Sequence, residues 1–297
     1  MEDYRKYLDP KTLNKIAGLD LKARLIVEGY ISGLHKSPYH GFSVEFAEHR
    51  EYSPGDDIRH VDWKVFGRTD RFYIKQYEEE TNLLANIVLD VSESMDYGSE
   101  GVSKLAYGQM IAAALAYLVI QQQDSAGLTM FDETVRAHLP PGSHAGHMKA
   151  LFHTLGQVEP KEKTGLGRIL SEVAGKIQKR GLVILISDLF DDPDVVLAGL
   201  RRLLHRRHDV IVFHVMDEAE LTFPFERMTR FEGLEELGEL VVNPRALREG
   251  YLQELESFRK RIRRGCTANR IDYVPLSTAT TLDVALSSYL ARRAGTK

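Results

Sequence analysis

The stretch Leu83–Met95, LLANIVLDVSESM, decides the fold of this 297-residue chain. Its first half is a nearly continuous apolar run, which is typical of a β-strand buried on both faces of a sheet. Its second half places Asp90, Ser92 and Ser94 where that strand leaves the sheet. The stretch therefore predicts a buried strand that ends in a polar site.

Four similar apolar runs follow, and segments with helical periodicity separate them. The runs are 127–131, 182–186, 210–215 and 271–276, and the helical segments are 103–123, 145–156, 166–179, 193–207, 245–264 and 281–293. This alternation predicts an α/β fold: a doubly wound, mostly parallel sheet with helices on both faces. We expect 134–139 to form a short edge strand beside 127–131 and 217–243 to hold a small inserted hairpin.

The chain is long enough for one large domain or two modest ones. Residues 1–35 show helical periodicity, and residues 36–82 interleave aromatic and charged side chains around a Pro54-Gly55 turn signal. We therefore predict an N-terminal helical and β extension over 1–82, followed by the α/β domain over 83–297.

The composition excludes several classes of protein. The 39 basic and 43 acidic residues give a net charge of -4, which is no reason to expect nucleic-acid binding. The single cysteine, Cys266, excludes an intramolecular disulfide and a cysteine-based zinc site, and it suits a reducing compartment. Residues 1–30 lack the apolar core of a signal peptide, and the longest nearly apolar stretch, 110–120, is shorter than the roughly 20 residues that span a bilayer. These features predict a cytoplasmic protein without a membrane span.

A second apolar run also ends in a carboxylate. The stretch LISDLFDD, residues 185–192, places Asp188 at the end of the run 182–186. In open α/β sheets ligands bind at the carboxyl ends of the strands where the strand order reverses, and in the order 3-2-1-4-5-6 the first and fourth strands are neighbours there. Asp90 and Asp188 should then face each other. Carboxylates and hydroxyls are hard oxygen donors that suit Mg²⁺ or Mn²⁺.

The segment LDVSESM, residues 89–95, resembles the D-x-S-x-S signature of von Willebrand factor A-type (vWA) domains. The resemblance implies a metal-ion-dependent adhesion site (MIDAS) that a threonine and a second aspartate complete. The matching positions are Thr164, in KTGLGRIL at 163–170, and Asp188, in ILISD at 184–188. Glu162-Lys163 replaces the usual Gly-Gly, and Leu189 stands where glycine is commoner. A threonine at the start of a helix can also serve as its N-cap.

The segment REYSPGDDIRHVDWK, residues 50–64, with Arg68-Thr69 and YEEE at 77–80, resembles the family called domain of unknown function 58 (DUF58). The likeness runs from about residue 20 to beyond Asp188. It implies a vWA-like domain with an N-terminal extension, a cytosolic adaptor role, and a MoxR-type AAA+ ATPase as partner. Many members also carry transmembrane helices. The 50–64 block itself is either an ion-paired anchor that docks the extension or a surface that faces a partner.

These patterns favour a non-enzymatic protein-binding module. In this hypothesis Mg²⁺ or Mn²⁺ bound by Asp90, Ser92, Ser94, Thr164 and Asp188 accepts an acidic side chain of a partner protein. The alternative is a metal-dependent, phosphatase-like hydrolase on a similar sheet, but the strand ends in D-V-S and not in the D-x-D of aspartyl phosphatases. A scaffold whose metal motif stays empty is the third possibility. The glycine-rich nucleotide-binding motifs are absent from the sequence.

Overall fold

The computed structural model describes residues 22–23, 26–27, 49–51, 63–69, 71–75, 83–99, 101–158, 165–232 and 239–287. The chain divides into two compact units, one of residues 37–82 and the other of residues 1–36 with 83–297. In the smaller unit β1 (His49–Glu51) pairs antiparallel with β2 (Tyr73–Lys75), and α3 spans Trp63–Thr69. Most of the 50–64 block lies outside the described residues, so both interpretations of it stay predictions.

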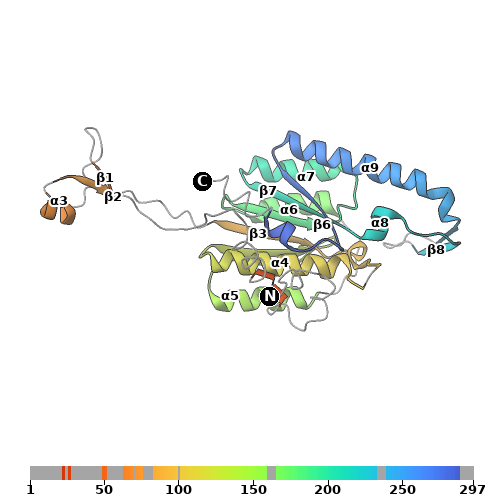
Figure 1. Ribbon diagram of the computed structural model, residues 1–297, viewed down its shortest axis with the longest axis horizontal. Coiled ribbons are helices and arrows are strands. Elements are labelled where there is room, and N and C mark those ends of the chain that lie inside the picture. The colour runs from red at the N-terminus through yellow and green to blue at the C-terminus, as the bar shows by residue number, and fades with distance from the viewer. Residues whose placement is uncertain are drawn as a thin grey trace, which may run out of the picture. The chain divides into compact units, whose positions relative to one another are not determined.

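A six-stranded sheet forms the centre of the larger unit (Figure 1). In spatial order its strands are β10 (Asp272–Ser277), β7 (Asp209–Met216), β6 (Leu182–Ser187), β3 (Leu84–Asp90), β4 (Ser125–Phe131) and β5 (Val135–Gly142). All neighbours are parallel except β4 and β5. The five apolar runs, the edge strand and the expected neighbours β3 and β6 are therefore confirmed, as is the mostly parallel α/β fold.

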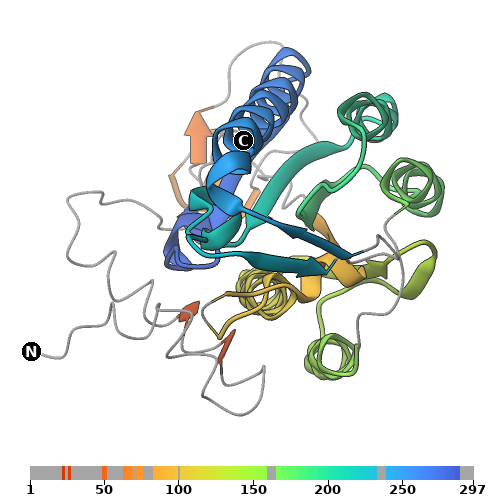
Figure 2. The same cartoon turned by 90° about the vertical axis from the view of Figure 1, so that its right-hand side faces the viewer.

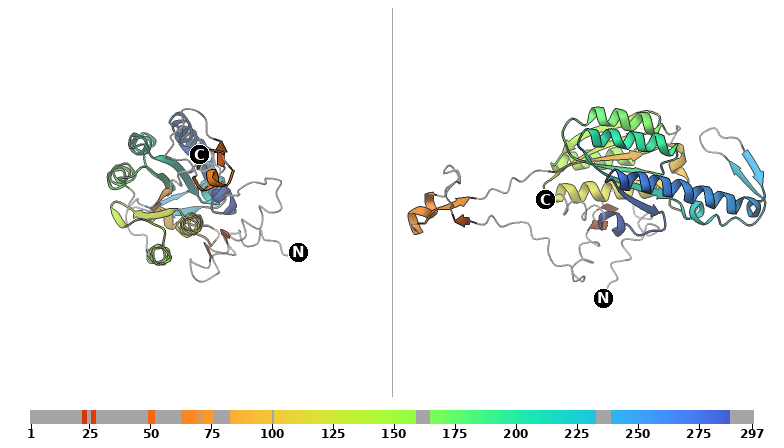
Figure 3. Two further views of the ribbon diagram at one scale, coloured as in Figure 1. Left: turned by 90° about the vertical axis from the view of Figure 1, so that its left-hand side faces the viewer. Right: turned by 90° about the horizontal axis from the view of Figure 1, so that it is seen from above.

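Helices cover both faces of this sheet, as Figures 1 and 2 show. One face carries α4 (Lys104–Gln121) and α5 (Ala145–Gly156), and the other carries α6 (Leu166–Lys176), α7 (Pro193–His205) and α9 (Pro244–Ala268). In Figure 3, α9 runs alongside α7. The predicted segment 281–293 is helical over 283–287, where its description ends.

The insertion after β7 contains the predicted hairpin and one element that the sequence did not indicate. The hairpin is β8 (Thr229–Glu232) paired antiparallel with β9 (Glu239–Val242). The unpredicted element is α8 (Glu218–Thr222), a helix of five residues. Five residues are too few to show a helical period, so α8 has a capping signal but no pattern of its own.

Alternate residues of β3 face two separate apolar cores. Leu89 packs in the cluster on the α4 side, and Val88 packs in the cluster on the side of α6 and α7. Ala23 and Ile26 are buried in the α4-side cluster. Among the described residues α4 is the one helix long and apolar enough to cross a membrane, and most of it is buried within the fold. A helix that is apolar all round is typical of a core position, which is where α4 lies.

Gly181, just before β6, allows β6 to approach β3 closely. A Cβ atom on Gly181 would lie 2.3 Å from the carbonyl oxygen of Leu84, at the start of β3. Gly181→Ala should therefore cost about 1–3 kcal/mol of unfolding free energy, because backbone cannot move aside as a flexible side chain can. Urea unfolding measures the loss. The control is Gly175→Ala in α6, where a Cβ meets nothing within 4 Å and the helix should gain up to about 1 kcal/mol. Equal stabilities for the two variants would contradict the close approach.

Candidate functional site

Four neighbouring strands end in a buried aspartate at the same edge of the sheet. Asp132, Asp90, Asp188 and Asp217 end or directly follow β4, β3, β6 and β7, and their exposed fractions are 1, 0, 7 and 0%. Because these strands are parallel, their carboxyl ends meet along one edge. The edge therefore concentrates negative charge, and each aspartate must be compensated by hydrogen bonds or cations.

Asp132 is compensated within its own turn. Its carboxylate accepts the backbone N–H of Thr134 at 2.9 Å and pairs with the guanidinium of Arg136. These contacts close the turn between β4 and β5, and they give Asp132 a structural role.

Among the described residues, hydrogen bonds compensate Asp217. Its carboxylate accepts the backbone N–H groups of Ser99 at 3.1 Å and Ala219 at 2.9 Å, and the hydroxyls of Ser99 and Thr278. Burial raises the pKa of Asp217, but the hydrogen bonds led by the Ser99 hydroxyl outweigh burial and hold this pKa below its ordinary value. The side chain of Glu220 caps the Asp217 N–H at 2.7 Å, which completes a capping box for α8.

Asp217→Ala should lower the free energy of unfolding by about 2–4 kcal/mol at pH 7, because buried donors lose their acceptor. Because the pKa of Asp217 is lowered in the folded protein, the stabilisation that its carboxylate gives depends on pH. The stabilisation is present above the ordinary carboxyl pKa of about 4 and disappears as the pH falls through the lower folded-state value. Urea unfolding of both proteins at pH 7 and pH 3 measures the difference. Glu172→Ala, which removes an exposed pair with Lys176, is the control and should cost under about 1 kcal/mol. An undiminished difference at pH 3 would contradict this role of the carboxylate.

Asp90, like Asp217, accepts hydrogen bonds from uncharged donors among the described residues, but at Asp90 these bonds do not outweigh burial. Its Oδ1 accepts the Ser92 N–H at 3.0 Å, and its Oδ2 accepts the Ser187 hydroxyl at 2.6 Å. Within the described part of the chain no cation pairs with this carboxylate. Burial first, and the charge of Asp188 second, raise the pKa of Asp90 to about 7. Because burial disfavours its charge, the ionised Asp90 carboxylate would be stabilised by a cation bound to it.

Asp188 contacts a cation supplied by the chain. The Lys104 ammonium lies 2.8 Å from Asp188 Oδ2, and the N–H of Phe190 donates to Oδ1 at 3.2 Å. Burial raises the pKa of Asp188, but Lys104 outweighs burial and holds this pKa below the ordinary value. Leu189 has φ +55°, the left-handed conformation that favours glycine, and it is fully buried. The turn thus keeps a conformation suited to glycine although leucine occupies it.

Two serines complete the cluster. Ser92 and Ser94 are buried, and their hydroxyl oxygens lie 3.1 Å apart. Ser92 precedes η3 (Glu93–Asp96), a 3₁₀ turn, but its hydroxyl makes no capping bond there. The Ser94 hydroxyl also stabilises the charged form of Asp188. The structure therefore brings together the predicted residues Asp90, Ser92, Ser94 and Asp188, whereas Thr164 lies outside the described residues.

The donor set fits a hard divalent cation. The three carboxylates of Asp90, Asp188 and Glu220 with the one ammonium of Lys104 carry a net charge of -2 when ionised, which a divalent ion would balance. The described residues hold no group of three or more His, Cys, Asp or Glu side chains placed to bind a metal. The cluster instead combines carboxylates with hydroxyls. Such oxygen donors suit Mg²⁺ or Mn²⁺ and are poor ligands for softer metals.

Sequence patterns did not reveal Lys104, Glu220 or His214 as parts of the site. Lys104 begins α4, whose first turn has no acidic residue, and a cation there opposes the helix dipole. That unfavourable position was the available signal that Lys104 has a specific anionic partner. His214, on β7, contacts the backbone of Asp188 and lies 2.6 Å from the hydroxyl of Tyr273, and burial lowers the pKa of His214 to about 4. In the sequence, His214 lies within the run 210–215, and no motif marks it as part of a site.

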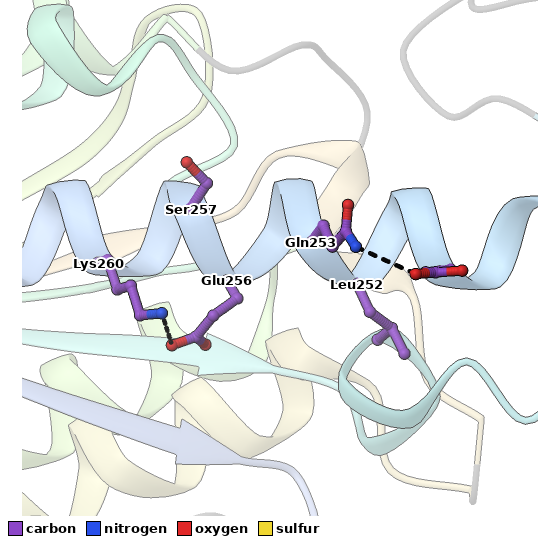
Figure 4. Close-up of a pocket in the computed structure, with 6 residues that line it drawn as sticks. Leu252, Gln253, Glu256, Ser257 and Lys260 are labelled. Atoms are coloured by element: carbon purple, nitrogen blue, oxygen red, sulfur yellow. Dashed lines mark hydrogen bonds and ion pairs between the residues drawn. The ribbon is translucent and has the colours of Figure 1, made fainter.

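A shallow depression lies along α9 (Figure 4). All of its lining residues come from this one helix: Glu249, Leu252, Gln253, Glu256, Ser257 and Lys260. Their polar groups pair with one another, as in the contacts of Gln253 with Glu249 and of Lys260 with Glu256. The depression brings no groups from separate elements together, so the strand-end cluster is the candidate site.

This chain is similar to several known proteins. The uncharacterized protein Rv1480 of Mycobacterium tuberculosis is 26% identical over 220 residues, which are 73% of this chain and 68% of that protein. BatB of Bacteroides thetaiotaomicron, described as a conserved hypothetical protein, superposes with a TM-score of 0.50 and 18% identity over 72% of this chain and 99% of BatB. The SpRpn10 VWA domain gives a TM-score of 0.42 and 13% identity over 69% of this chain and 93% of that domain.

The family assignment rests on a match that covers most of the chain. The model of the family described as "Protein of unknown function DUF58" matches residues 48–261. The matched segment includes the 50–64 block, the D-x-S-x-S stretch at the end of β3 and Asp188. The chain, with its mostly parallel α/β sheet, therefore belongs to the DUF58 family.

Proposed function

We propose that this chain is a non-enzymatic protein-binding module that uses a Mg²⁺ or Mn²⁺ ion as a bridge. Asp90, Ser92, Ser94 and Asp188 would hold the ion, and Thr164 would complete the set. The observation that carries the proposal is the Asp90 carboxylate, fully buried, without a cation among the described residues and beside a second carboxylate. The cost of that arrangement is offset when a cation binds.

The same donor set supports binding to an acidic partner. Two of these four donors are neutral hydroxyls, and a site with few direct carboxylates leaves a divalent ion electrophilic. Mg²⁺ prefers six oxygen ligands and keeps exchangeable waters, so a carboxylate from a partner protein can replace one of them. The vWA-like fold is consistent with such an interaction module.

A hydrolase is the weaker alternative on the described residues. Metal-assisted hydrolysis also needs an acid or base to move protons. The two basic side chains beside the cluster are Lys104, held by two carboxylates, and His214, buried between Asp188 and Tyr273. Neither is free to serve a substrate, which supports binding over catalysis.

The proposed partner is a MoxR-type AAA+ ATPase in the cytoplasm. This part of the proposal rests on the resemblance of the 50–64 block to DUF58 and on the ordinary globular composition. The proposed function involves neither nucleic-acid binding nor a membrane span.

Retention of proteins from cognate cell lysate tests the proposal. The full chain is immobilised and lysate is passed over it in Mg²⁺ or in EDTA, with an Asp90→Ala column in parallel. We expect mass spectrometry to identify a partner protein that is retained only by the wild-type column and only in Mg²⁺. We expect an AAA+ ATPase among the proteins retained in this way. Identical retention under all three conditions would contradict the metal bridge. Release of phosphate from a generic ester that depends on Asp90 and Mg²⁺ would favour the hydrolase.

A further inference from the structure

Lys104 is a buried cation inside the candidate metal site. Its side chain is 3% exposed, and its ammonium lies 2.8 Å from Asp188 Oδ2 and 2.8 Å from Glu220 Oε1. The ring of Tyr97 lies 5.9 Å from the ammonium, within the range of a cation–π contact. The chain therefore delivers a positive charge to one of the carboxylates that would bind the divalent ion.

We infer that Lys104 competes with the divalent ion for Asp188 and that Glu220 retains the ammonium when the ion binds. The inference rests on the proposed metal site and adds the residue that sets its affinity. The ammonium and the ion need the same carboxylate, and two cations in one buried cluster repel each other strongly. The protein would then bind Mg²⁺ more weakly than its oxygen ligands alone would allow.

Glu220 makes the exchange possible without leaving Lys104 unpaired. An ammonium that lost Asp188 would keep Glu220 and the face of Tyr97. Glu220 also accepts the N–H of Asp217 through its other oxygen, so the shifted ammonium would contact the carboxylate that caps α8. A purely structural ion pair would need only one of the two carboxylates.

Calorimetric titration of the full chain with Mn²⁺, repeated with Mg²⁺, tests the inference. Lys104→Met should bind Mn²⁺ at least tenfold more tightly than wild type, a change of 1.4 kcal/mol. Lys104→Arg keeps the charge and should stay near the wild-type affinity. The control for net charge is Lys176→Met, which removes a half-exposed lysine of α6 and should change the affinity less than twofold. Lys104→Gln, an amide that can still donate to Asp188, replaces the methionine variant if that variant does not fold.

A double-mutant cycle tests whether Glu220 acts by holding the Lys104 ammonium or only through its own negative charge. Glu220→Gln keeps an acceptor for the Asp217 N–H but removes the alternative site for the ammonium. We expect it to weaken Mn²⁺ binding several-fold in the wild-type background and much less in the Lys104→Met background. An equal loss in both backgrounds would contradict the retention of the Lys104 ammonium by Glu220.

The outcomes distinguish the inference from the proposed function. Binding that tightens only when the charge of Lys104 is removed supports the inference. Unchanged or weaker binding in Lys104→Met, with wild type binding Mn²⁺, contradicts the inference and leaves the metal site standing. Binding by Lys104→Met but not by wild type supports the competition and contradicts a metal-dependent function. Absence of binding in both proteins contradicts both.

Discussion

Asp90→Asn will be more stable than wild type in EDTA and will no longer respond to Mg²⁺. The asparagine keeps the shape of the side chain and can bond to Ser92 and Ser187, but it carries no charge that burial disfavours. The raised pKa of Asp90, about 7, sets the expected gain on the order of 2–4 kcal/mol above pH 7, because one pKa unit corresponds to about 1.4 kcal/mol. Wild type, in contrast, should gain about 2.7 kcal/mol in Mg²⁺ at 100 times the dissociation constant.

The stability difference between Asp90→Asn and wild type in EDTA should grow as the pH rises. A group whose folded-state pKa is raised gives its full stabilisation below the ordinary value near 4 and loses it as the pH rises through about 7. The advantage of Asp90→Asn in EDTA should therefore vanish near pH 4 and be largest at pH 8. Urea unfolding at both pH values, with and without Mg²⁺, measures it. Asp96→Asn, an exposed neighbour in η3, is the control and should behave as wild type. An Asp90→Asn protein that is less stable than wild type in EDTA at pH 8 would contradict this account of the site.

Lys104→Met will lower the free energy of unfolding in EDTA by about 3–5 kcal/mol. Removal of one partner from a buried ion pair leaves the other charge desolvated without compensation, and that cost exceeds the value of the pair itself. Here the methionine would leave Asp188, whose carboxylate is 4% exposed, without its cation. Urea unfolding in EDTA at pH 7 is the measurement.

A cycle with Asp188→Asn shows whether the loss comes from that carboxylate. In the Asp188→Asn background the lysine still contacts Glu220, so Lys104→Met should cost much less there than in wild type. Additive losses in the double variant would mean that Lys104 stabilises the protein through other contacts, and the buried pair would have little weight in the fold.

The fold could be predicted from the sequence because its signals are local. Each buried strand is a short apolar run, and the run at 83–89 is followed directly by Asp90 in the same segment. The expected strand order then placed Asp188 next to Asp90, and the pairing of β3 with β6 confirms it. The hydroxyls of Ser92 and Ser94 follow from the same stretch and lie together as expected.

The electrostatic partners could not be predicted because their contacts join distant parts of the chain. Lys104 and Glu220 are 116 positions apart, and α8, which carries Glu220, is too short to show a pattern. Asp217 likewise depends on Ser99 and Thr278, each far from it in sequence. The sequence shows which residues end the strands, whereas the charge that each one meets depends on how loops from several strands converge.

The most direct test of the central claim is an anomalous difference map from crystals of the full chain grown with Mn²⁺. We expect one strong peak at the carboxyl ends of β3 and β6, with the Asp90 carboxylate and the hydroxyls of Ser92 and Ser94 among its oxygen ligands. A map in which Asp90 and Asp188 contact no manganese, although the ion is present at saturating concentration, would contradict the metal-bridging account.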